Sequence, residues 1–192
     1  MHPDRKPQYF PVGLFSKYPE VSEWEARWYA SELRHLREPS LVEGESRRKY
    51  SVYRFLRMPS FWPSLVIRLV VSPDGTGTLV AKRTNSQVED ENAPREQTLP
   101  ISSEQVNDFL NLLHEADFWS LPTAKSRSGF DGEEWLLEGK RNDKYHVVDR
   151  WSGAMEETYS RACNYLQELS PLKVERRRRR RDTSQESIPT PE

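Results

Sequence analysis

Residues 131–151 read DGEEWLLEGKRNDKYHVVDRW, and they are the most regularly patterned stretch of this 192-residue chain. Two runs that suit β-strands flank Asn142 and Asp143, and both residue types tolerate the positive φ of a tight turn. We therefore expect a β-hairpin whose loop centres on these two residues. A loop centred there pairs Trp135 with Arg150, Leu137 with Val148, and Gly139 with His146, and a slip of one residue would exchange these partners.

The predicted hairpin also bears on whether its His and Asp residues act together in catalysis. Successive side chains of a strand point to opposite faces of a sheet, so His146 and Asp149 fall on opposite faces. This separation excludes a dyad in which Asp149 orients His146, as a hydrolytic triad would require. We interpret the stretch as a packed sheet with aromatic and β-branched cross-strand pairs, in which Arg150 stacks on Trp135.

Three helices are predicted outside the hairpin. A capping-box pattern at Ser22 and Glu25 predicts the start of a helix that carries Trp24, Trp28, Leu33 and Leu36 and stops at Pro39. A second capping box, at Ser102 and Gln105, predicts another helix with an apolar stripe at Val106, Phe109, Leu110, Leu113 and Ala116. The third helix is expected at residues 153–170, with Cys163 on its apolar face.

The remaining strand signals lie in the middle of the chain. Runs at 53–58, 65–72 and 77–84 suit strands, and residues 97–102 suit a short strand or an extended entry. Short turns join the strand pairs, which favours antiparallel pairing. The sequence therefore predicts an α+β fold: a single domain in which an antiparallel sheet of about five to six strands packs with about three helices.

Composition divides the chain into three parts. Residues 1–20 contain four prolines, and we expect them to form an extended N-terminal lead-in. Residues 21–172 are expected to form the single α+β domain, which is long enough to bury a core without disulfides or metal. Residues 173–192 are Arg-rich and poor in apolar residues, so we expect a disordered tail.

The residue types also narrow the classes of function. Cys163 is the only cysteine, so no internal disulfide can form, and no Cys/His cluster completes a zinc site. No apolar run suggests a secretory signal or a membrane span, so we expect a soluble, cytoplasmic protein with no membrane partner. The chain has no phosphate-binding loop or nucleophile elbow, and we predict no catalytic residues, no cofactor and no metal.

Three sets of residues remain as candidates for binding. Trp135, His146 and Arg150 share one face of the predicted hairpin, where we expect a pocket if the protein has one. Phe61 and Trp62 lie between two prolines, and an exposed pair there would be a rigid apolar anchor for an interface. The third set could attract a polyanion without regard to sequence, and its members are Arg176, Arg177, Arg178, Arg179, Arg180 and Arg181.

Four blocks of the chain are EWEARWYASELRHLREPSL, YRFLRMPSFWPSLVIRL, FWSLP followed by GFDGEEWLLEG, and YHVVDRWS. Together they resemble blocks of an uncharacterised bacterial protein family with no established activity, over residues 23–170. The pattern DGxxWxLEG…YHxVxRWS, here residues 131–152, is the most specific of them. The resemblance implies no catalytic residues, but it implies that residues 20–172 form one unit to which the tail is appended.

We expect a non-enzymatic, soluble binding or protein-interaction domain whose partner is another protein. Two alternatives stay open. One is a hydrolase or transferase in which His146 acts with a carboxylate from another element, such as Asp131 or Glu134. The other is association with nucleic acid or another polyanion through Arg176–Arg181.

Overall fold

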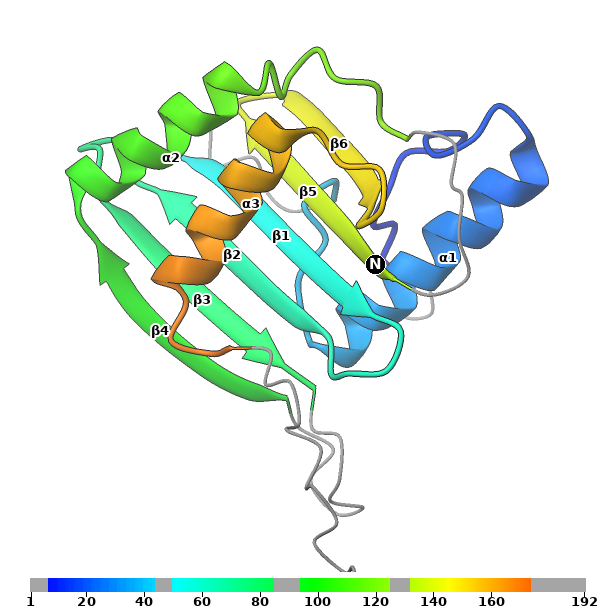
Figure 1. The fold of residues 1–192 in the computed structure, drawn as a ribbon, viewed down its shortest axis with the longest axis horizontal. Coiled ribbons are helices and arrows are strands. Elements are labelled where there is room, and N and C mark those ends of the chain that lie inside the picture. The colour runs from blue at the N-terminus through cyan, green and yellow to red at the C-terminus, as the bar shows by residue number, and fades with distance from the viewer. Residues whose placement is uncertain (1–6, 44–49, 85–93, 125–131, 174–192) are drawn as a thin grey trace, which may run out of the picture.

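The computed structural model describes residues 7–43, 50–84, 94–124 and 132–173. Within these residues, six strands form one antiparallel sheet in the order β4-β3-β2-β1-β5-β6, accompanied by three helices (Figure 1). This confirms the predicted α+β fold. The elements are α1 (Pro19–His35), β1 (Ser51–Pro59), β2 (Leu65–Val71), β3 (Gly77–Arg83), β4 (Arg95–Ile101), α2 (Ser103–Glu115), β5 (Glu133–Arg141), β6 (Lys144–Trp151) and α3 (Glu157–Leu169).

The β5–β6 hairpin has the predicted register. Asn142 takes a φ of 54° in its turn, which is the left-handed conformation expected there. His146 and Asp149 point to opposite faces, because the ring of His146 packs on Phe118 whereas Asp149 accepts a hydrogen bond from Tyr29. The observed pairs include Trp135 with Arg150, Leu137 with Val148, and Gly139 with His146.

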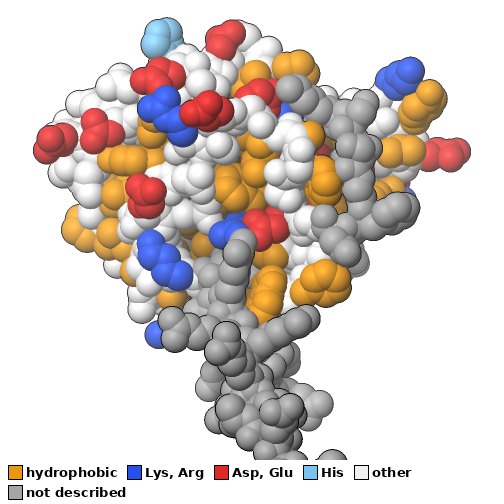
Figure 2. All heavy atoms as spheres, in the orientation of Figure 1, with side chains coloured by type: hydrophobic (Ala, Val, Ile, Leu, Met, Phe, Trp, Pro, Cys, Tyr) orange, Lys and Arg blue, Asp and Glu red, His pale blue; other side chains and the backbone are white. Residues whose placement is uncertain are grey.

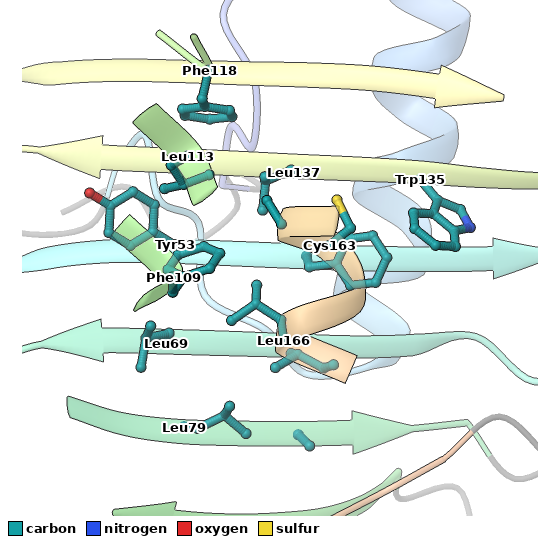
Figure 3. Packing of buried hydrophobic residues seen from close by; sticks show 14 of the residues in the cluster. Tyr53, Leu69, Leu79, Phe109, Leu113, Phe118, Trp135, Leu137, Cys163 and Leu166 are labelled. Atoms are coloured by element: carbon teal, nitrogen blue, oxygen red, sulfur yellow. The ribbon is translucent and has the colours of Figure 1, made fainter. Parts of the chain in front are cut away.

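Both faces of the sheet are covered, which gives the molecule three layers. Helices α2 and α3 lie over one face, and α1 lies behind the opposite face (Figure 1). The larger core cluster fills the α2/α3 face and the smaller one fills the α1 face, where Tyr29 and Leu33 pack on Leu56, Leu136 and Val147. Figure 3 shows the larger cluster, with Phe109 and Leu113 of α2 and Cys163 and Leu166 of α3 above Tyr53, Leu69, Leu79, Trp135 and Leu137.

The two predicted capping boxes have different outcomes. The box at the start of α2 is confirmed, because Ser102 Oγ accepts a hydrogen bond from the Gln105 N–H and Gln105 Oε1 accepts one from the Ser102 N–H. The predicted box at Ser22 is wrong. Helix α1 begins at Pro19, whose ring suits the first turn of a helix because it has no N–H to satisfy. Ser22 therefore lies inside the helix, where its hydroxyl accepts a hydrogen bond from the Phe15 N–H.

The segment before α1 contributes to the core. Tyr9, Phe10 and Phe15 are each at most 5% exposed. The ring centroids of Phe10 and Phe15 are 5.1 Å apart, and Phe15 lies 5.3 Å from the ring of Tyr29. Folded structure in the described residues therefore begins well before residue 20, because this segment closes the α1 face.

A buried ionic ladder crosses the α1 face of the sheet. Arg54 is fully buried, and its Nε and Nη2 atoms lie 2.6 and 2.8 Å from the two carboxylate oxygens of Glu138. The hydroxyl of Tyr145 donates to the same carboxylate at 2.8 Å. Burial, and then the charge of Glu138, hold the pKa of Tyr145 well above its ordinary value. The two strands beside β5 are thus joined through a single carboxylate.

The ladder continues through Glu38, which follows α1. Its carboxylate accepts a hydrogen bond from Arg68 at 2.8 Å and lies 3.0 Å from Nζ of Lys82. The guanidinium of Arg54 is 3.8 Å away, and Glu96 adds a second carboxylate 3.6 Å from Lys82. Cations and carboxylates neutralise one another along the ladder, so its role is to join the 36–43 segment to the sheet.

Candidate functional site

The hairpin face that was expected to border a pocket is packed. Trp135 is 6% exposed, and its ring contacts that of Phe55 edge to face at a centroid distance of 5.2 Å. The guanidinium of Arg57 lies 5.6 Å from the Trp135 ring, and Glu133 accepts a hydrogen bond from the indole nitrogen. Trp135 is therefore a core residue whose polar atom has a partner.

Arg150 is held by polar contacts on several sides. It is 1% exposed, and its Nε donates to Glu156 at 2.8 Å. Its Nη1 donates to the carbonyl oxygens of Pro122 and Thr123 at 3.0 and 3.2 Å. Its aromatic neighbour is Tyr159, at 5.7 Å, rather than the tryptophan that the sequence suggested. Arg150 thus ties the chain after α2 and the start of α3 to strand β6.

His146 lies between aromatic rings on the α2 side of the sheet. Its ring is 5.1 Å from Phe118 and 6.2 Å from Trp119, and its buried Nε2 has no hydrogen-bond partner. Burial lowers the pKa of His146 below its ordinary value. Hydrogen bonding to the backbone of Leu121 opposes this shift, whereas the cations Lys144 and Arg150 add to it. The environment therefore favours the neutral imidazole, and the charged groups that act on it are both basic.

The structure separates His146 from the carboxylates considered as its partners. Asp149 lies on the α1 face, where Tyr29 donates to its Oδ1 at 2.8 Å. Glu134 alternates with Trp135 along β5 and so also points away from the His146 face. Asp131, the remaining carboxylate, lies outside the described residues. Among the described residues, therefore, neither Asp149 nor Glu134 can orient His146.

The single cysteine and the acidic residues decide whether nucleophile or metal chemistry is open to the described part of the chain. Cys163, on α3, is fully buried in the larger core cluster. Burial raises the pKa of its thiol far above the ordinary value. A thiol in such a setting is held in its unreactive protonated form. In the part of the chain that the structure describes, no group of three or more His, Cys, Asp or Glu residues is placed to hold a metal ion.

The proline-flanked aromatic pair lies in the turn between β1 and β2. Phe61 is 77% exposed, whereas Trp62 is partly buried. Only one ring of the pair therefore projects into solvent to the extent that an anchor requires. The arginine run, Arg176–Arg181, lies outside the described residues.

A set of exposed apolar side chains lies instead on α1 and at its start. Tyr18 is 61% exposed, Val21 is 45% exposed and Trp24 is 55% exposed. They are three residues apart, so they share one side of the helix with Trp28. We call Tyr18, Val21, Trp24 and Trp28 the α1 apolar surface. In Figure 2, apolar and charged side chains lie together over the N-terminal end of α1, at the right of the view.

The two tryptophan rings of this surface are held by stacking. Trp24 stacks on Trp28 with centroids 5.6 Å apart, and Trp28 stacks on Tyr29 at 5.1 Å. Tyr29 is fully buried and hydrogen-bonded to Asp149. A continuous series of contacts therefore runs from the exposed Trp24 into the core, and it restricts the side chain without covering it.

The spacing of the apolar residues of α1 contains a signal for this surface. The sequence predicts a helix that carries Trp24, Trp28, Leu33 and Leu36 at near-helical spacing. Leu33 is fully buried, whereas Trp24 is more than half exposed. The spacing from 24 to 28 to 33 drifts around the helix, and this drift is the sign that α1 carries two apolar sides rather than one.

The unpaired edge of the sheet is a weaker candidate for an interface. Strand β4 is largely exposed, but Pro94 and Pro100 flank or interrupt its edge and Arg95 and Glu96 place charges on it. Prolines and charges of this kind are how native proteins prevent edge strands from pairing with other chains. The other edge, on β6, is bridged by the parallel contact of Ala124 with Asp149.

Comparison with models of known protein families and with curated proteins finds no match to this chain. In the described residues, none of the helices combines the length and the apolar character that crossing a membrane requires.

Proposed function

We propose that this chain is a non-enzymatic binding domain that contacts another protein through the α1 apolar surface. The observation that carries the proposal is Trp24, which is 55% exposed although its ring is stacked on Trp28. A restricted aromatic side chain loses little conformational entropy when a partner covers it. Tryptophan and tyrosine are for this reason enriched among the residues that dominate interface energies.

The position of α1 supports the same proposal. The opposite side of the helix buries Tyr29 and Leu33 in the core, so the exposed side is presented on a rigid element. Sites on rigid helices hold their geometry better than sites on loops. Charged residues at Glu23 and Arg27, paired at 2.9 Å, border the apolar side chains as the polar rim of an interface does.

A photoreactive amino acid at position 21 of the full chain tests this proposal. Val21 is 45% exposed and lies one helical turn from Trp24, so the probe disturbs little packing. We expect irradiation of cells that contain the protein to give covalent adducts with a protein, and the added substitution Trp24→Ser to remove them.

The matched control places the same probe at Thr98, which is exposed on β4. Equal adduct formation from positions 21 and 98, or no adduct from position 21, would contradict the proposal. Adducts confined to position 21 that depend on Trp24 would support it.

Binding of polyanions is a second candidate function. It is favoured by the basic residues around Lys173, which precedes the arginine run in the sequence. Lys173 is exposed, and its carbonyl oxygen accepts a hydrogen bond from Arg83 at 2.7 Å. Arg83 on β3 lies opposite Arg95 on β4 in the register of the two strands. Three basic residues therefore gather at the corner of the sheet from which the chain continues to Arg176–Arg181.

Retention on immobilised heparin tests this second function. The full chain is compared with a chain that lacks residues 175–192 and with one whose six arginines are replaced by glutamine, which keeps the length. We expect the full chain alone to elute at raised salt, with a strong dependence on ionic strength, because its cations release counterions from the polyanion. Elution of all three proteins at the same salt concentration would rule out binding of polyanions through the tail.

A further inference from the structure

We infer that the partner of the α1 apolar surface is a second copy of this chain, which packs its own α1 against it in antiparallel orientation. The inference rests on the proposed function, because it names the partner of that same surface. It starts from the pattern of Val21, Trp24, Trp28 and Ser31, which follow one another at intervals of three, four and three residues. This alternation is the spacing of the residues that meet in helix pairs.

The seam formed by these four residues lies on the exposed side of α1, with Trp28 partly buried against the core cluster of the α1 face. Ser31 and Trp24 are both exposed, and the other side of α1 buries Tyr29 and Leu33. Nothing in the described part of the chain therefore prevents a second helix from approaching along the seam. A small residue at position 31 gives such a helix room beside the two tryptophans.

A two-fold axis between positions 24 and 28 gives the seam complementary contacts. Trp24 of one copy then lies against Trp28 of the second copy, and the contact occurs twice because the interface is self-complementary. Val21 of one copy lies against Ser31 of the second copy, so a larger side chain meets a smaller one. The interdigitation of large and small residues is what close packing of two helices requires.

Charge decides between the antiparallel and the parallel arrangement. Glu20, Arg27 and Arg34 recur at seven-residue intervals and lie along one flank of the seam. Antiparallel pairing brings Glu20 of each copy to Arg34 of the other copy. Parallel pairing would instead place each of these residues beside the same residue of the second copy, so that like charges would meet. Arg27, near the axis, is already paired with Glu23 at 2.9 Å, and Arg34 is held 5.7 Å from the ring of Tyr9.

Sedimentation velocity on the full chain, from low micromolar to submillimolar concentration, tests the inference. We expect the wild-type chain to dimerise and the Trp24→Ser variant to remain monomeric over the same range. Phe61→Ser is the matched control, because it removes a ring that is 77% exposed outside the seam. It is expected to dimerise like the wild type.

Charge reversal tests the orientation. We expect Glu20→Arg and Arg34→Glu each to raise the dimer Kd by about 2- to 30-fold, since two exposed ion pairs are lost per dimer. The double variant exchanges the two charges and is expected to recover an affinity close to the wild type. Circular dichroism of each variant checks that the fold is retained.

The outcomes separate the inference from the proposed function. A wild-type chain that stays monomeric while position 21 crosslinks to a different protein overturns the inference and leaves the proposed function standing. A monomeric chain without adducts overturns both. A dimer that survives Trp24→Ser, or reversals whose combination gives no recovery, overturns the antiparallel α1 pairing.

Discussion

Arg54 shows how one side chain can join several elements. It is fully buried on the α1 face, where it makes a two-pronged contact with Glu138 and donates to the carbonyl oxygen of Pro39. Arginine suits this position because its planar guanidinium can donate hydrogen bonds to a carboxylate and to a carbonyl oxygen at the same time. A buried charge of this kind is tolerated only while its partner remains.

Removal of the Arg54 charge is expected to destabilise the protein strongly. Arg54→Met leaves the Glu138 carboxylate buried without its main partner, and we expect the free energy of unfolding to fall by about 3–5 kcal/mol in urea titrations. Arg54→Met combined with Glu138→Gln removes both charges and still offers Tyr145 an acceptor. The double variant should recover part of the loss, and a loss equal to the sum of the two single variants would contradict the pairing argument.

His146 is expected to make stability depend on pH. Its pKa is lowered in the folded state from the ordinary value of 6.5, so the unfolded chain binds the proton more readily. The contribution of the neutral His146 side chain to the free energy of unfolding is therefore complete above pH 6.5. It is lost as the pH falls below that value toward the pKa of the folded state.

We expect the unfolding free energy of the wild type to decline between pH 7 and pH 5 more steeply than that of His146→Gln. The measurement is urea denaturation of both proteins across this range. Parallel pH profiles for the two proteins would show that burial of the imidazole has no such effect. The comparison cancels the contributions of the other titrating groups, which the two proteins share.

Among the elements, the β5–β6 hairpin was the most fully specified by its own residues. Asn142 and Asp143 fix the turn, and alternation of apolar and polar residues fixes which side chains face each layer. Helix α1 was specified less well. Its start depends on Pro19 and on the contact of Ser22 with the backbone of Phe15, which lies outside the helix.

The capping box of α2 is expected to stabilise the protein through the helix end alone. Ser102→Ala removes the acceptor for the Gln105 N–H, and we expect a loss of about 0.5–2 kcal/mol in the free energy of unfolding. Ser102→Asp is the matched variant, because it restores an acceptor at the helix start and should return most of that stability. Equal stability of Ser102→Ala and the wild type would show that the box contributes nothing.

At the scale of the molecule, the two faces of the sheet are covered by different kinds of structure. The α2/α3 face is closed by two helices whose stripes are evident in the sequence, whereas the α1 face needs the segment before α1 and the ionic ladder as well. Tyr9 joins both, because it packs in the aromatic cluster and donates to the carbonyl oxygen of Glu38 at 2.6 Å.

Truncation of the N-terminus is expected to show where the folded body begins. A chain of residues 17–192 lacks Tyr9, Phe10 and Phe15, each of which contributes about 1.5–3 kcal/mol when buried. We expect its thermal midpoint to fall sharply or its cooperative unfolding to be lost. A chain of residues 7–192 keeps all three rings and should unfold like the full chain. Similar midpoints for both truncated proteins would contradict this account.

The elements and the candidate surface differ in how far the sequence predicts them. Strands and two of the helices follow from alternation, turn residues and capping signals that act over a few residues. Trp24 and Leu33 look alike in that local pattern, but one is exposed and the other is buried. Their difference depends on which side of α1 meets the sheet, and residues distant in the chain decide that.

By itself, the sequence determined the separation of His146 from Asp149 and the antiparallel α+β fold. Each of these depends on local backbone geometry and on the two-residue period of a strand. Only the tertiary structure decided that Trp135 and Arg150 are packed inside, that Arg54 has a carboxylate partner and that Trp24 stays exposed. Burial and charge pairing are properties of the contacts between elements, and no local pattern contains them.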